Sequence, residues 1–96
     1  LPDEQNAYHL FPIIVKGKEN RDRLHDYLVE NGVGTVCHYP NAPHKQECYA
    51  NEVWNTPQLS LPITERIADE ELSLPMGPTI KESEVQEIIR LINDFV

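Results

Sequence analysis

Residues 62–75 read PITERIADEELSLP, and this stretch combines two periodicities. Thr64 can cap a helix, and Ile67, Ala68 and residues 71–72 give that helix a narrow apolar face. Residues 72–74 then alternate between apolar and polar side chains, which indicates a short strand. A helix that passes almost directly into a strand favours a fold of mixed α and β structure.

Three further elements are predicted before this stretch. Residues 8–15 form an apolar, β-rich run that indicates a strand, in which Pro12 marks a sheet edge or a break. Residues 21–31 place apolar side chains at helical spacing after Asn20, a good N-cap residue, and so predict a helix. Residues 35–39 are a candidate for a second short strand.

The last predicted element is the most regular one. A capping box of Thr79 with Glu82 can begin it, and the nearby Ser83 and Glu84 leave its first residue open. Its apolar residues fall on one helix face: Val85, Ile88, Ile89, Ile92 and Phe95. Together the elements predict an α+β domain, with a small antiparallel-type sheet and helices packed on one side of it.

The composition restricts both the size of the fold and the class of partner. The 96 residues suit one small domain with a modest core. The net charge of −8 argues against binding to nucleic acid or to an anionic membrane. No apolar run approaches the roughly 20 residues that span a bilayer. Two cysteines are too few for a disulfide framework, which favours a reducing cytoplasm.

Most of the polar side chains that could bind a ligand or react lie in one loop, residues 33–46. His38, Tyr39, His44 and Gln46 suit the recognition of a hydroxyl-rich ligand, because imidazole, phenol and amide groups can each donate and accept hydrogen bonds. Two prolines in the same loop restrict its backbone and would pre-organise these groups. The sequence therefore predicts a binding surface here, and a plain surface loop is the alternative.

Two other interpretations of this region involve its cysteines. Cys37, His38, His44 and Cys48 have the ligand chemistry of a zinc site, so a free-standing zinc- or ligand-binding module stays open. Adjacent residues on a strand point to opposite faces, however, which argues against Cys37 and His38 binding one ion. Cys37 could also act as a nucleophile, although no helix N-terminus precedes it to lower its pKa. We favour the interpretation that both cysteines pack within the fold.

Several blocks of sequence occur in a characteristic order. They are YHLF at 8–11, NRDxL at 20–24, GTxxHYP at 34–40, PHxQxxY at 43–49 and ERxADExLSLPxGP at 65–78. Together they resemble the C-terminal domain of the DegT/DnrJ/EryC1/StrS sugar aminotransferases, over nearly the whole chain. The HYP block followed by PHxQ looks most like the branch that acts on keto groups of dTDP-linked 6-deoxyhexoses.

The resemblance implies the C-terminal small domain of the aspartate-aminotransferase fold at residues 7–96, after a linker at 1–6. It implies a pyridoxal-phosphate (PLP) enzyme that moves an amino group, usually from glutamate, to a nucleotide-linked ketosugar. The N-terminal PLP domain with its Schiff-base lysine is not in this chain. We therefore expect the chain alone to be inactive and not to bind PLP stably.

The resemblance also implies partners and site residues. The intact enzyme would be a cytoplasmic homodimer, and this domain would meet both the N-terminal PLP domain and the nucleotide-sugar substrate. His38 is the first candidate for contact with the sugar, followed by Tyr39 and His44, and then by Gln46. No catalytic residue and no metal ligand is expected within the chain itself.

Overall fold

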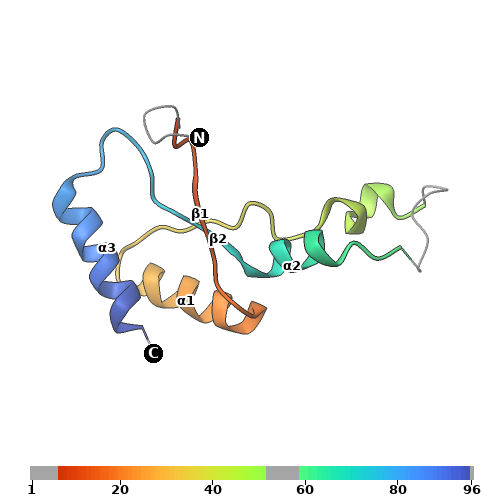
Figure 1. Cartoon of the computed structure of the whole chain (residues 1–96), viewed down its shortest axis with the longest axis horizontal. Helices are drawn as coiled ribbons and strands as arrows, with labels where there is room; N and C mark the ends of the chain where they lie inside the picture. The colour runs from red at the N-terminus through yellow and green to blue at the C-terminus, as the bar shows by residue number, and fades with distance from the viewer. Residues whose placement is uncertain (1–6, 52–58, 96) are drawn as a thin grey trace.

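The computed structural model describes residues 7–51 and 59–95, so the predicted linker at residues 1–6 lies outside the described part. In Figure 1 the two strands cross each other near the centre of the view, one helix lies below the crossing, and the C-terminal helix lies to the left. In chain order the elements are β1 (Phe11–Ile14), α1 (Lys18–Glu30), two 3₁₀ helices (Pro43–Lys45 and Glu47–Tyr49), α2 (Pro62–Glu70), β2 (Glu71–Leu74) and α3 (Glu82–Asp94). The predicted α+β fold is confirmed. Within the described ranges, no helix combines the length and the apolar character needed to cross a membrane.

The sheet is one antiparallel pair, β1 with β2, in which Pro12 lies opposite Ser73. The backbone N–H and C=O of Ser73 point the other way and bond to Val36 at 2.8 and 3.2 Å. Pro12 therefore sits in a pair that needs no N–H from it, and β1 is an edge strand as predicted. The predicted strand at 35–39 is wrong, because only Val36 pairs with β2.

Helix α1 begins at Lys18, earlier than the predicted residue 21. Gly17 precedes it with a φ of +87°, a conformation that glycine adopts without a steric penalty. The backbone N–H of Gly17 donates to Glu70 Oε1 at 2.9 Å, which fixes the turn from β1 into α1. Asn20, the predicted N-cap, consequently lies inside the helix.

Helix α2 begins at Pro62, where the missing N–H costs nothing. The side chain of Glu65 reaches back, and its Oε1 accepts the N–H of Leu61 at 3.0 Å. The prediction that Thr64 caps this helix is therefore wrong. Helix α2 ends at Glu70, two residues before the predicted end at Leu72, and β2 starts directly at Glu71 without a connecting loop.

Helix α3, in contrast, begins later than predicted. The backbone N–H of Lys81 donates to Glu84 Oε2 at 2.7 Å, which is one half of a capping box. The predicted box of Thr79 with Glu82 is not formed, because the helix starts at Glu82 itself. The glutamate half of the expected box is thus present, shifted by two residues along the chain, and Lys81 has no side-chain acceptor for the other half.

The core lies between α1, α3 and β2. Its buried members are Leu24, Leu28, Val33, Leu72, Ile88 and Leu91. The predicted face of α3 is partly wrong, since Val85 and Ile89 are 37% and 47% exposed while Leu91 is buried. The apolar surface of α3 is wider than the stripe that packs against the core. Periodicity alone therefore predicted a buried face that is rotated slightly from the observed one.

Candidate functional site

His38 is attached to strand β2 through its backbone and its ring. Its backbone N–H donates to Glu71 Oε2 at 2.5 Å, and its ring Nδ1 lies 2.9 Å from Ser73 Oγ. Ser73 Oγ in turn donates to Glu71 Oε1 at 2.5 Å. Residues two apart on a strand share a face, which is why Glu71 and Ser73 can both reach His38. Both side chains are buried, at 4% and 5% exposure.

Tyr39 stands beside His38 and faces outward. The ring centroids of His38 and Tyr39 are 5.5 Å apart in an edge-to-face arrangement, across a cis peptide bond. The Tyr39 side chain is 71% exposed, whereas His38 is half-buried. One anchored imidazole and one exposed phenol therefore form a surface that can exchange hydrogen bonds with hydroxyl groups of a ligand.

His44 and Lys45 attach the loop to the start of α2. His44 is buried, and its Nε2 lies 2.9 Å from Glu65 Oε1. Lys45 Nζ lies 2.9 Å from the other carboxylate oxygen of Glu65. The N–H of Leu61, followed by Lys45 and His44, lowers the pKa of Glu65 from 4.5 to about 2. The Glu65 carboxylate thus holds both the loop and the helix start.

This carboxylate makes the loop sensitive to acid. A carboxylate with a depressed pKa stabilises the fold above its unfolded pKa, and that contribution is lost as the pH falls through the folded value. We expect the difference in free energy of unfolding between the native chain and a Glu65→Gln variant to narrow as the pH falls from 4.5 toward 2. Urea unfolding at a series of pH values measures it, and a difference that stays constant over this range would contradict the prediction.

The structure treats the predicted site residues differently. It brings His38 and Tyr39 together, packs His44 against Glu65 and leaves Gln46 exposed between the two 3₁₀ helices. The supporting residues Glu71 and Ser73 were not predicted. Their signal in the sequence is a polar residue at alternate positions of an otherwise apolar strand.

The two cysteines have separate roles. Cys37 is half-buried against the core, and its Sγ accepts a hydrogen bond from Arg21 Nη1 at 3.1 Å. Cys48 is exposed, so the interpretation that both cysteines pack inside is wrong for Cys48. In the part of the chain that the structure describes, no three His, Cys, Asp or Glu side chains are grouped to hold a metal ion. The four candidate zinc ligands are therefore not gathered into one site.

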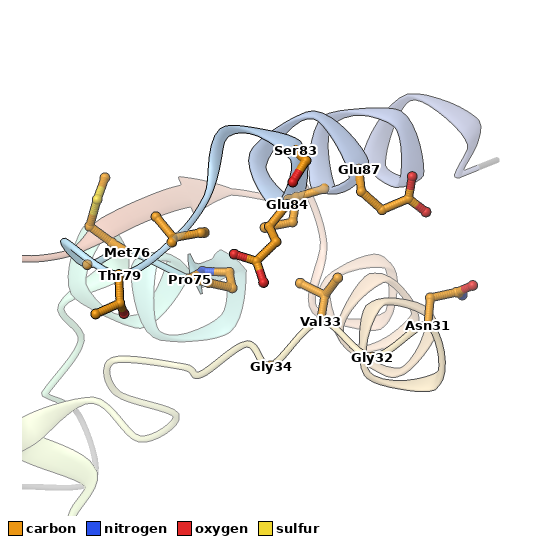
Figure 2. A pocket seen from close by; sticks show the side chains of 13 residues that line it. Asn31, Gly32, Val33, Gly34, Pro75, Met76, Thr79, Ser83, Glu84 and Glu87 are labelled. Carbon is orange, nitrogen blue, oxygen red and sulfur yellow. The ribbon is translucent and has the colours of Figure 1, made fainter.

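A cavity of about 620 Å³ lies elsewhere, between the end of α1, the loop after β2 and the start of α3 (Figure 2). Val33, Pro75 and Ile88 give it an apolar lining, while Ser83 and Glu84 stand at its α3 side. None of the four predicted substrate-binding residues lines it. The candidate site is consequently the open surface at His38 and Tyr39.

Comparison with known proteins places the chain among sugar aminotransferases. Residues 1–93 match the DegT/DnrJ/EryC1/StrS aminotransferase family. The dTDP-3-amino-3,6-dideoxy-alpha-D-galactopyranose transaminase of Aneurinibacillus thermoaerophilus is 37% identical over 97% of this chain and 24% of its own length. The dTDP-3-amino-3,4,6-trideoxy-alpha-D-glucose transaminase of Streptomyces venezuelae is 34% identical over 98% of this chain and 24% of its own. The chain spans about a quarter of these relatives.

Solved structures agree with this assignment. DesV of S. venezuelae, in complex with a ketimine intermediate, is similar with a TM-score of 0.80 and 34% identity. The similarity covers 91% of this chain and 22% of DesV. A DegT DnrJ EryC1 StrS aminotransferase from Brucella abortus has a TM-score of 0.81 and 30% identity, over 99% of this chain and 24% of its own. The fold is thus found as one part of larger aminotransferases.

Proposed function

The chain belongs to the DegT/DnrJ/EryC1/StrS aminotransferase family, and from this we propose that it forms the sugar-facing part of an enzyme that aminates a dTDP-linked ketosugar with glutamate as the donor. The observation that carries the proposal is the 37% identity, over 97% of the chain, to a transaminase of a dTDP-linked 3-amino sugar. A second dTDP-sugar transaminase at 34% identity supports the same nucleotide.

His38 and Tyr39 are the residues that we propose contact the sugar. Support comes from their geometry: His38 is fixed to β2 on one side, and the Tyr39 ring beside it is exposed. Side chains held by their neighbours bind without a large loss of conformational entropy. His44 is buried against Glu65 and would act by positioning the loop, while the exposed Gln46 would reach the substrate from its rim.

PLP is the cofactor of this family, and we propose that this chain alone does not bind it stably. A Schiff-base lysine has to lose its proton, which burial favours and exposure to water does not. All lysines of the chain are exposed: Lys16, Lys18, Lys45 and Lys81. We infer that PLP binds to another part of the intact enzyme. We also infer that the intact enzyme is a homodimer in the cytoplasm. The free thiols of Cys37 and Cys48 support a reducing compartment.

The test compares the chain with the intact enzyme. We expect the intact enzyme to convert a dTDP-linked 3-ketosugar to its amino sugar in the presence of glutamate and PLP. The chain alone should show no absorbance band of PLP bound to a lysine. A relative that aminates a UDP-N-acetyl sugar is 29% identical over 96% of this chain, so the UDP-linked ketone is the matched control substrate. A preference for that control would contradict the proposed nucleotide.

A further inference from the structure

The protons of the Glu71–Ser73–His38 cluster can be placed by counting donors. The backbone N–H of His38 always donates, so Glu71 Oε2 accepts there. A carboxylate has no proton to give, so the hydroxyl of Ser73 must donate its one proton to Glu71 Oε1. Ser73 Oγ then has only lone pairs left for the ring of His38, 2.9 Å away. The Nδ1 of His38 must therefore carry a proton.

We propose that Glu71 and Ser73 fix the tautomer of His38, so that its neutral ring carries the proton on Nδ1 and presents Nε2 as a hydrogen-bond acceptor. Among the described residues, no hydrogen bond involves Nε2 of His38. Nδ1 is thus bound to Ser73 on β2, and Nε2 remains available to a ligand. Glu71 and Ser73 are positioning residues, since they act on the ligand through His38.

The fixed tautomer restricts what can bind at His38. An acceptor nitrogen is satisfied by a hydroxyl group, which donates a proton, and repels a keto oxygen, which only accepts. Resting on the proposed function, this places a hydroxyl of the sugar at His38 and directs the keto carbon elsewhere. A buried or half-buried acceptor left without a donor costs binding energy, so this contact discriminates between substrates.

Two small substitutions should change the tautomer in different ways. Ser73→Ala removes the acceptor that holds the Nδ1 proton. Glu71→Gln has nearly the same shape, but its amide must turn its oxygen to the fixed N–H of His38 and its NH₂ group to Ser73. The Ser73 hydroxyl then accepts a hydrogen bond from the amide and donates one to Nδ1, so the ring carries its proton on Nε2, which becomes a donor. Ser73→Thr keeps the hydroxyl and should preserve the native tautomer.

The experiment reads the tautomer directly in the intact enzyme labelled with ¹⁵N-histidine, at pH 8, where free imidazole is neutral. The signal of His38 is identified by its loss in His38→Asn. We expect a protonated Nδ1 and an unprotonated Nε2 in the native enzyme and in Ser73→Thr. We expect the reverse in Glu71→Gln, and a loss of the preference in Ser73→Ala. A protonated Nε2 in the native enzyme, or an unchanged pattern in Glu71→Gln, would overturn the proposal.

A kinetic arm tests the consequence for the substrate. The probes are the dTDP-linked ketosugar and its analogues in which fluorine replaces one hydroxyl and cannot donate. For one analogue we expect the native enzyme to lose about tenfold in kcat/KM, the worth of one hydrogen bond. The ratio of kcat/KM for the ketosugar to kcat/KM for this analogue should fall toward one in Ser73→Ala and Glu71→Gln. If no ketosugar is aminated at all, the proposed function fails, whereas the spectrum of His38 still decides on the tautomer.

Discussion

Replacing His38 with asparagine in the intact enzyme is expected to lower kcat/KM for the ketosugar by roughly 10- to 100-fold. The shorter amide still fits beside Ser73 and Glu71 but no longer presents an imidazole nitrogen to the sugar. The free energy of unfolding should change little, because the backbone N–H of residue 38 keeps its bond to Glu71. Steady-state kinetics at saturating glutamate, together with urea unfolding, measure both quantities.

The matched control for this prediction is Cys48→Ser. Cys48 is exposed and lies on the same segment of chain, ten residues after His38. We expect its kinetics to match those of the native enzyme. Native kinetics in His38→Asn as well would contradict the proposal that His38 contacts the sugar. A loss of activity that is explained by a loss in free energy of unfolding would show that His38 acts only in folding.

Arg21→Ala is expected to give the largest loss of stability, about 3–5 kcal/mol in free energy of unfolding. Arg21 is 3% exposed on α1, and its Nη1 donates to the carbonyl oxygens of Ala68 and Glu71 at 3.4 and 3.0 Å. Alanine leaves these buried acceptors unpaired and creates a cavity, and both effects destabilise the fold. Urea unfolding followed by circular dichroism gives the value.

Arg23→Ala provides the comparison on the same helix. Arg23 is exposed and lies 5.6 Å from the centroid of the Phe95 ring, a cation–π contact that is worth about 0.5–1 kcal/mol at a surface. We expect Arg23→Ala to lose much less stability than Arg21→Ala, because Arg23 is exposed. Similar losses in both variants would show that Arg21 contributes through the charge of α1 and not through its buried hydrogen bonds.

The sequence carries enough local information to predict most of the helices. Apolar spacing located α1 and α3, because each buries a stripe against the core, and it located α2, which buries Ala68. Their first residues were harder, since the cap depends on contacts from distant parts of the chain. Gly17, for example, is held by Glu70, which lies 53 residues away in the sequence.

The failed strand at 35–39 shows how side chains override a local pattern. Its alternating residues suit a strand, and Val36 does pair with Ser73. The ladder stops two residues later, because the N–H of His38 bonds to the side chain of Glu71 instead of to a backbone carbonyl. This competition between a side chain and the strand cannot be seen in residues 35–39 alone.

The candidate site was predicted in part for the same reason. His38 and Tyr39 stand out because they lie together in a loop with two prolines. The residues that hold them come from β2, 33 and 35 residues further along the chain. Only the folded arrangement shows that His44 is buried against Glu65 and that Gln46 is exposed.

Strand β2 also has a mechanical consequence for the site. Ser73 pairs with Val36 through its backbone and bonds to His38 through its side chain. The orientation of the imidazole is therefore set by its hydrogen bond to β2 and not by the loop in which His38 lies. Any rigid-body displacement of the domain would carry this ring with it, in an unchanged orientation relative to β2. Tyr39, at 71% exposure, can instead reorient by rotating its own side chain.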